Sequence, residues 1–194
     1  MIENSGSRVL DKLSKVKLLA MDVDGTLTDG AMIVHNGEQI KSFHAHDGLG
    51  IRLAMNYGLK IAWVTGNVSS AVADRARAIG VTELYQGSWV KSTVIDEIAA
   101  RHGLSCEEIA FIGDDLNDLR AFERAGVAIA VANASEEVKQ RADVVTERRG
   151  GEGAVREAIE MILKSRGEWE DAIERFLVML DDQEAGKAGP EAVV

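Results

Sequence analysis

The chain has 194 residues and a formal net charge of −10, with 46% hydrophobic and 28% charged residues. This composition is typical of a globular protein with one sizeable core. It argues against a membrane protein, because no run of about 18 apolar residues occurs. The acidic balance, without a basic stripe, argues against a nucleic-acid partner. Cys106 is the one cysteine, so no intrachain disulfide can form, and we expect a cytoplasmic protein.

Six short apolar runs predict the strands of a sheet. They cover residues 16–23, 59–66, 83–87, 109–114, 127–131 and 143–146. Most of them lack the alternation of apolar and polar residues that marks a strand with one face in water. Continuous apolar runs of this length are typical of parallel strands that helices cover on both faces.

Segments with helical periodicity separate these runs, and several end in glycine, a residue that commonly follows a helix. They cover residues 50–58, 69–80, 91–103, 117–126 and 135–142, and two more helices are expected over 153–167 and 169–180. This alternation predicts an α/β fold with a doubly wound parallel sheet. We expect a single domain over residues 1–181 and a flexible C-terminal tail over 182–194.

Residues 31–43 interrupt the alternation with two strand-like runs around Asn36-Gly37. This dipeptide favours a type I′ turn, so we expect a β-hairpin. The hairpin follows the first strand directly and should therefore lie over the carboxyl ends of the strands, where open α/β sheets bind ligands. Two interpretations remain open, a flap over a site or a purely structural edge hairpin.

Polar residues gather where the expected strands end. The first run ends in Asp22 and Asp24, the second in Thr65, Gly66 and Asn67, Lys91 opens the helix after the third, and Asp114, Asp115, Asn117 and Asp118 end the fourth. Because the carboxyl ends of neighbouring parallel strands meet at one edge of a sheet, these side chains should converge. The sequence thus predicts one site with several carboxylates, a hydroxyl and an ammonium group.

Asp22 and Asp24 are close enough in sequence to repel each other unless a cation compensates them. Oxygen ligands from Asp22 and Asp114 suit Mg²⁺, and magnesium favours phosphate substrates. Thr65, backbone N–H groups and Lys91 would then hold phosphate oxygens. One carboxylate of the pair would attack phosphorus, and the other would protonate the leaving oxygen and then activate water. These residues indicate phosphate-ester chemistry that depends on Mg²⁺.

Four motifs occur in the order that the haloacid dehalogenase superfamily of phosphatases shows. They are "DVDGTLTDG" (22–30), "TGN" (65–67), Lys91 and "GDDLND" (113–118). The chain resembles that superfamily over roughly residues 16–166, and the resemblance implies a Rossmann-like fold with Mg²⁺ as cofactor. It implies that Asp22 is the nucleophile and Asp24 the acid/base. It also implies phosphate binding by Thr65, Gly66 and Lys91.

The same resemblance implies the metal ligands, namely Asp22, the backbone carbonyl of Asp24, and Asp114, with Asp115 or Asp118 in support. Many members of the superfamily carry a large cap domain that selects the substrate. Here only a hairpin and a helix fit between the first two motifs, and only a helix and a strand fit between the second and the third. We therefore expect no cap domain.

Three further segments resemble the capless phosphatases of 3-deoxy-D-manno-octulosonate (KDO) 8-phosphate and of nonulosonate 9-phosphates. They are "FHAHDGLGIR" (43–52), "LYQG" (84–87) and "RRGGEGAVRE" (148–157). Those enzymes are homotetramers in which a neighbouring subunit closes each site, and the resemblance implies the same assembly here. It also implies a substrate pocket lined by His46, Asp47, Gly48, Arg52, Asn67 and Arg75.

The expected activity is Mg²⁺-dependent hydrolysis of a phosphorylated sugar acid through an aspartyl phosphate, with KDO 8-phosphate as the first candidate. Asn67 stands where the KDO 8-phosphate enzymes usually have arginine, and His46 stands where they often have it. "GDDLND" and "GGEG" (150–153) are closer to the nonulosonate 9-phosphate phosphatases. Both substrates therefore remain open.

Two non-enzymatic alternatives use similar residues. A response-regulator receiver domain also combines strand-end aspartates, threonine, lysine and Mg²⁺, but its phosphorylated aspartate lies apart from the acidic pair. A phosphatase scaffold that serves only as a regulatory subunit would have no need of the intact set of Asp22, Asp24, Thr65, Lys91 and Asp114. The sequence therefore favours an enzyme.

Overall fold

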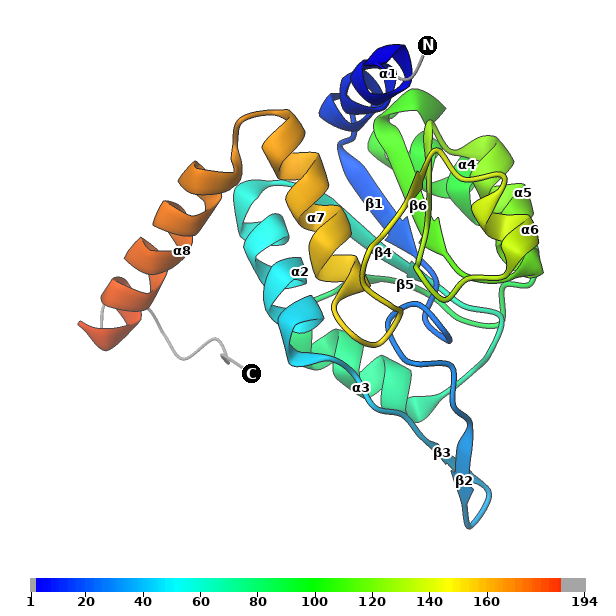
Figure 1. Cartoon of the computed structure of the whole chain (residues 1–194). Coiled ribbons are helices and arrows are strands. Elements are labelled where there is room, and N and C mark those ends of the chain that lie inside the picture. Colours follow the sequence, from blue (N-terminus) through cyan, green and yellow to red (C-terminus); the bar gives the residue numbers. More distant parts are fainter. Residues whose placement is uncertain (1–2, 186–194) are drawn as a thin grey trace.

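A six-stranded parallel sheet forms the centre of the computed structural model, which describes residues 3–185 (Figure 1). The strand order is β5-β4-β1-β6-β7-β8. The strands are β1 (Leu18–Met21), β4 (Lys60–Val64), β5 (Glu83–Tyr85), β6 (Ile109–Gly113), β7 (Val127–Ala130) and β8 (Val144–Val145). All residues of β1 and β6 are buried, as their continuous apolar runs predict. The six predicted strands are confirmed.

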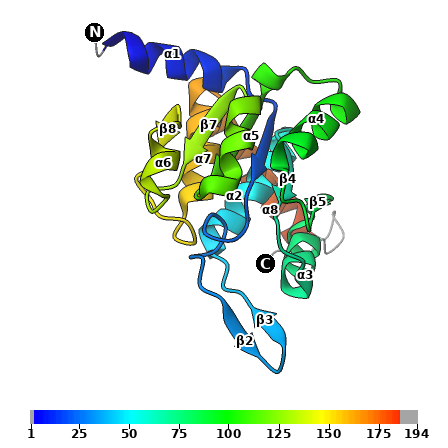
Figure 2. The same ribbon diagram turned by 90° about the vertical axis from the view of Figure 1, so that its right-hand side faces the viewer.

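Helices cover both faces of the sheet, so the doubly wound α/β fold is confirmed (Figures 1 and 2). One layer contains α1 (Glu3–Ser14), α2 (Ala45–Tyr57) and α7 (Ala154–Ser165), with α8 (Trp169–Glu184) packed on α2, and the other contains α4 (Lys91–His102) and α5 (Leu119–Arg124). The remaining helices are α3 (Ser70–Ile79), α6 (Glu136–Lys139) and the 3₁₀ turns η1 (Cys106–Glu108) and η2 (Leu116–Asp118).

Strand β1 lies in the interior of the sheet, between β4 and β6. Leu18 is in register with Lys60 on one side and with Ile109 on the other. The chain runs from β1 outward through β4 to β5 and then returns to β6, so the direction of winding changes beside β1. Ligands bind outside the carboxyl ends of the strands at such a switch point. The ends of β1, β4 and β6 therefore define the place for a site.

The predicted hairpin is confirmed as an antiparallel pair of β2 (Ile33–His35) and β3 (Glu38–Ile40). Asn36 and Gly37 have φ values of 51° and 83°, and a type I′ turn requires positive φ at both positions. The hairpin projects from the body of the molecule (Figures 1 and 2). No cap domain is present between residues 3 and 185.

The ends of the chain differ in part from the sequence-based expectation. Helix α1 was not predicted, because its first half, with its serine and glycine, has little apolar periodicity. Helix α8 continues to Glu184, although a flexible tail was expected from residue 182 onward. Residues 186–194 of that expected tail lie outside the described part of the chain. Within the described part, no helix is both long and apolar enough to cross a bilayer.

Candidate active site

The first aspartate motif lies at the carboxyl end of β1, where the chain leaves the sheet. The Asp22 N–H still donates to the Ile112 carbonyl at 2.9 Å, and the Asp22 side chain is buried. The chain then turns at Gly25, which has a φ of +96°. A Cβ at Gly25 would also overlap the carboxylate of Asp114. Glycine therefore allows both the turn and the close approach of the two acidic motifs.

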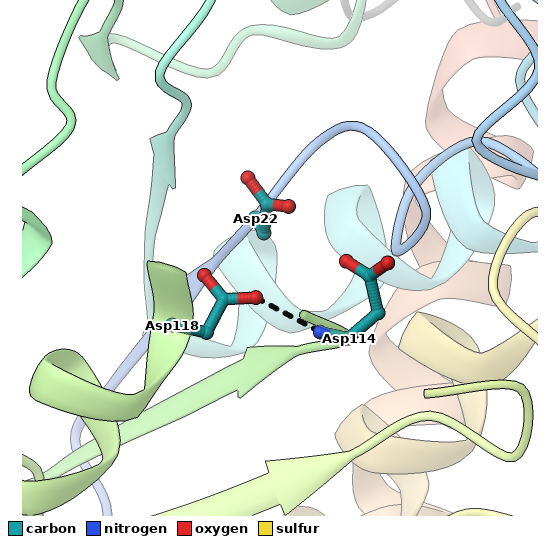
Figure 3. A group of neighbouring side chains, drawn as sticks. All are labelled: Asp22, Asp114 and Asp118. Atoms are coloured by element: carbon teal, nitrogen blue, oxygen red, sulfur yellow. Dashed lines mark hydrogen bonds between the residues drawn. The ribbon is translucent and has the colours of Figure 1, made fainter. Parts of the chain in front are cut away.

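Three aspartates gather at this edge of the sheet (Figure 3). Asp22, Asp114 and Asp118 each contribute one carboxylate oxygen to a group whose members all lie within 4.8 Å of one another. Burial and the charge of Asp118 raise the pKa of Asp22 to about 6. Burial and the charges of Asp22 and Asp118 raise the pKa of Asp114 to about 8. The fold therefore concentrates negative charge here that is only partly neutralised.

Lys91 supplies a cation to this cluster from the start of α4. Its side chain is fully buried, and its Nζ lies 2.6 Å from Asp22 Oδ1 and 2.5 Å from Asp118 Oδ1. Burial lowers the pKa of Lys91, but the attraction of the two carboxylates outweighs burial and leaves the pKa raised. An ammonium group therefore lies directly beside the expected nucleophile.

Asp118 has both carboxylate oxygens occupied. Oδ1 pairs with Lys91, while Oδ2 accepts the backbone N–H groups of Asp114 at 2.9 Å and Asp115 at 3.3 Å. These bonds fix the turn after β6 and hold Lys91 in place. Asp118 therefore positions its neighbours, whereas Asp115 is exposed and accepts the N–H of Leu116 at 2.8 Å.

Asp22 and Asp114 are the carboxylates best suited to a metal ion. Burial first, and then the charges of the neighbouring aspartates, raise the pKa of each carboxyl by more than Lys91 lowers it. An all-oxygen donor set of this charge fits a hard divalent cation such as Mg²⁺. Bound Mg²⁺ would keep both carboxylates ionised at neutral pH. The backbone carbonyl of Asp24 stays a predicted third ligand.

The Asp24 carboxylate has a different set of partners. One oxygen pairs with Lys41 Nζ, and the other accepts Asn67 Nδ2 at 2.9 Å. Thr65 Oγ1 lies 3.5 Å from that second oxygen. The side chain of Asp24 therefore has partners of its own, separate from those of Asp22 and Asp114, which agrees with the predicted acid/base role.

Lys41 joins the site although its place in the sequence does not predict this. Lys41 follows β3 at the base of the hairpin, and its side chain is only 1% exposed because it pairs with Asp24. This contact ties the base of the hairpin to the site. A lysine in a hairpin is normally solvated, so the sequence offered no signal beyond its closeness to the acidic motif.

A cavity of about 460 Å³ opens over these groups. It is lined by Asp22, Asp24, Gly30, Thr65, Gly66, Asn67, Trp89, Asp114, Asp115, Leu116 and Asn117. The structure thus brings together residues from the first, second and fourth predicted motifs, with Lys91 buried beneath them. A larger and mainly apolar cavity of about 770 Å³, lined by α1, β8 and α7, lies away from these carboxylates and has no part in this chemistry.

Five of the six residues expected to bind the sugar do not line this cavity. Asp47 is buried and accepts the N–H of Arg156 at 2.7 Å, so it joins α2 to the first turn of α7. Arg52 donates to the Ala78 carbonyl at 2.9 Å. The others outside the lining are His46, Gly48 and Arg75. Asn67 alone of the six lies in the cavity wall, and a sugar-binding role for the rest stays a prediction.

The "RRGGEG" segment supports the first motif from behind. The Gly151 N–H donates to the Thr26 carbonyl at 3.0 Å, and a Cβ at Gly150 would overlap the backbone of Gly25. The Gly150 N–H donates to Asn133 Oδ1 at 2.7 Å. These glycines therefore let one loop pack directly on the turn that carries the aspartates, a role for which the sequence offers no local signal.

Stabilisation by Mg²⁺ is expected to grow with pH. An aspartate in the unfolded chain titrates near pH 4, whereas Asp22 and Asp114 in the folded protein have pKa values of about 6 and about 8. Without metal, the fold therefore loses stability as pH rises through this window, because it disfavours the charged forms. Thermal unfolding with and without Mg²⁺ should show a gain in Tm of a few degrees at about pH 8 and a smaller gain at about pH 5. Asp114→Asn should remove most of this difference, and an equal gain at both pH values would contradict the assignment.

The proteins that this chain resembles agree with a phosphatase site at the end of β1. A family model described as haloacid dehalogenase-like hydrolase matches residues 76–159. The 3-deoxy-D-manno-octulosonate 8-phosphate phosphatase KdsC of Escherichia coli K12 is 38% identical over 165 residues, which are 84% of this chain and 88% of the relative.

Solved structures share the whole architecture. A putative haloacid dehalogenase superfamily (subfamily III A) hydrolase from Legionella pneumophila has a TM-score of 0.88 and 39% identity, over 91% of this chain and 97% of that one. The KDO 8-phosphate phosphatase of Moraxella catarrhalis, in complex with magnesium, phosphate and KDO, has a TM-score of 0.84 and 37% identity, over 88% of this chain and 98% of that one. The chain therefore belongs to the haloacid dehalogenase superfamily of hydrolases, in the subfamily of the KDO 8-phosphate phosphatases.

Proposed function

We propose that this chain is a Mg²⁺-dependent phosphatase that hydrolyses KDO 8-phosphate through an aspartyl-phosphate intermediate. The observation that carries the proposal is the arrangement at the end of β1. Asp22 lies beside a buried ammonium group and a metal-suited carboxylate, while Asp24 faces the same cavity with separate partners. The names and the bound ligands of the relatives support this substrate.

The chemistry follows in two steps. An oxygen of Asp22 forms a bond to phosphorus while the bond from phosphorus to the sugar oxygen breaks, and Asp24 donates its proton to that leaving oxygen. Asp24 then takes a proton from water, the water oxygen bonds to phosphorus, and the bond to Asp22 breaks. Inorganic phosphate is released and both aspartates return to their starting states.

Other groups of the site would stabilise charge during these steps. Lys91 would hold Asp22 ionised and face the phosphoryl oxygens, and Thr65 would donate to one of them. Asp22 and Asp114 would hold Mg²⁺, which when bound neutralises charge on the phosphate. Asn67 and Lys41 would orient Asp24 toward the leaving oxygen.

A nonulosonate 9-phosphate is the second candidate substrate, because the residues that line the cavity do not distinguish it from KDO 8-phosphate. No lysine or arginine appears among the described residues that line the cavity. The Asn67 side chain donates to Asp24 and so is turned toward the catalytic group. The carboxylate of a bound sugar acid would therefore need a cation from outside this cavity wall. This holds equally for KDO 8-phosphate and for a nonulosonate 9-phosphate.

The test is a panel of substrates with Mg²⁺. We expect kcat/KM for one phosphorylated sugar acid to exceed that for glucose 6-phosphate by about a hundredfold. KDO 8-phosphate and a nonulosonate 9-phosphate are compared directly, and chelation of Mg²⁺ should stop both reactions. Equal activity on every phosphate ester, or full activity without metal, would overturn the proposal.

We infer further that the chain acts as a homotetramer. Four apolar residues of the hairpin segment, Met32, Ile33, Val34 and Ile40, are 50%, 53%, 65% and 51% exposed, and an isolated two-stranded hairpin is marginal in water. Pairing of hairpins between copies would cover these side chains and both edges. Light scattering gives the number of copies, and an active monomer would contradict the inference.

The domain range, the excluded partners and the location of the protein are inferred from its sequence. We propose one catalytic domain over residues 1–181, with neither nucleic acid nor a membrane as a partner, and a cytoplasmic location. The single cysteine and the acidic composition support these points. The proposed partner is the sugar phosphate, which the site would bind and hydrolyse.

A further inference from the structure

The side chain of Trp89 is far more exposed than those of the other two tryptophans. Its side chain is 67% exposed, whereas Trp63 is fully buried and Trp169 is 9% exposed. Trp89 also belongs to the wall of the cavity over Asp22 and Asp24. A large aromatic surface left in water is unfavourable, so a cover for it is expected when the site is filled.

The loop that carries Trp89 is fixed to the loop expected to bind phosphate. The Gly87 N–H donates to the Asn67 carbonyl at 3.2 Å, and the Ser88 N–H donates to the Thr65 carbonyl at 2.9 Å. A Cβ at Gly66 would lie 3.2 Å from an indole carbon, so the ring lies over a residue that has no side chain. The backbone that carries the indole is therefore fixed before any ligand binds, which lowers the entropic cost of binding.

The wall of the cavity contains both carboxylates and exposed apolar residues. Its carboxylates, at Asp22, Asp24 and Asp114, belong with the metal and the phosphoryl group. The exposed apolar residues in the same wall are Trp89 and Leu116, of which Leu116 is 56% exposed. This apolar part of the wall is therefore available to contact the leaving group of a phosphate ester whose phosphorus lies beside Asp22.

We propose that the indole of Trp89 stacks against the C–H face of the leaving sugar and so selects substrates with an extended carbon skeleton. The inference rests on the proposed function and adds a specificity-determining residue to it. Hydroxyl groups of the sugar point sideways into water or toward polar neighbours, while its C–H groups cover the ring. The ring thereby loses exposed apolar area on binding.

The first experiment compares Trp89→Ala and Trp89→Phe with the unchanged protein, using two substrates. With the sugar phosphate that the unchanged protein hydrolyses best, Trp89→Ala should raise KM about tenfold, as expected for loss of one aromatic contact, while kcat changes little. Trp89→Phe should restore most of the affinity. With acetyl phosphate, which has no sugar, neither variant should differ from the unchanged protein.

Val68→Ala is the matched control, because Val68 is an exposed apolar residue, at 75%, on the neighbouring loop but outside the cavity wall. It should leave KM unchanged for both substrates. An equal loss with both substrates for Trp89→Ala would indicate a structural role and overturn the proposal. An unchanged KM, or a change in assembly size by light scattering, would overturn it as well, the latter because it would place Trp89 between subunits.

A second experiment detects the contact between Trp89 and the sugar by fluorescence, in the absence of turnover. Because Trp63 and Trp169 are buried, Trp89 should dominate any fluorescence change when free KDO is added with Mg²⁺ and inorganic phosphate. The change should disappear in Trp89→Phe, and a change that persists there would contradict the proposal. If the chain hydrolyses acetyl phosphate but no sugar acid phosphate, the proposed function fails. The same titration with free glucose in place of KDO then decides the role of Trp89 separately.

Discussion

Asp22→Asn is expected to abolish phosphatase turnover, by about four orders of magnitude or more, as loss of a covalent nucleophile generally does. The amide cannot form the acyl phosphate, although its shape nearly matches that of the carboxylate. Phosphate release under saturating Mg²⁺ measures the effect. Acid quenching of the unchanged protein during turnover should trap phosphate on Asp22, and none should be trapped in the variant. Normal turnover by Asp22→Asn would refute the assignment of the nucleophile.

A loss of activity must be separated from a loss of folding. Burial and Asp118 raise the pKa of Asp22 to about 6, so above that pH the fold disfavours the charged carboxylate. The neutral amide removes this penalty, and the metal-free variant at about pH 8 should be no less stable than the unchanged protein. Asp74→Asn is the matched control, because Asp74 is 69% exposed on α3 and should keep full activity.

Lys91→Met is expected to remove both activity and much of the stability. The substitution keeps most of the apolar stem of the side chain but leaves Asp22 and Asp118 buried without their common cation. Breaking a buried pair in this way costs about 3–5 kcal/mol in the free energy of unfolding. Because the pKa of Lys91 is raised, its contribution is fully present at neutral pH and is lost only as pH rises through that value. Denaturant unfolding at neutral pH measures the loss.

The double variant Lys91→Met/Asp118→Asn distinguishes the structural role of Lys91 from its chemical role. The carbonyl oxygen of the amide introduced by Asp118→Asn can still accept the N–H groups of Asp114 and Asp115, and one buried charge is gone. We expect the double variant to regain most of the stability but none of the activity. A single variant as stable as the unchanged protein, or a double variant that recovers turnover, would show that this pair matters less than the geometry indicates.

The sheet could be predicted because a buried parallel strand has a local signature. Continuous apolar runs at 16–23 and 109–114 stand out without any knowledge of their neighbours, and Asn36-Gly37 identifies its turn by backbone preference alone. The convergence of Asp22 and Asp114 follows from the sheet as well, since strand ends in a parallel sheet meet at one edge. The grouping of the acidic motifs at one edge of the sheet could thus be predicted from local patterns.

Contacts between distant segments had no such signature. Lys41 reaches Asp24 only because the hairpin folds back at its base, and Gly150 reaches the Gly25 turn from beyond the last strand. Local sequence patterns define neither the direction of a side chain nor the partner it meets across the fold. For the same reason, the contact by which Asp47 joins α2 to α7 could not be predicted from its neighbours in sequence.

By itself, the sequence determined the α/β class, the order of the strand-end motifs along the chain and the set of chemical groups at the site. Periodicity, turn preference and spacing are local properties, and they suffice for these conclusions. Only the tertiary structure decided which partners and which surroundings each carboxylate has. Asp118 is bound to Lys91 and to backbone N–H groups, burial and neighbouring aspartates raise the pKa of Asp22 and Asp114, and Asp24 is held by Lys41. The physical reason is that the pKa and the partners of a buried carboxylate depend on burial and on charges within a few ångströms, which packing of the whole chain sets.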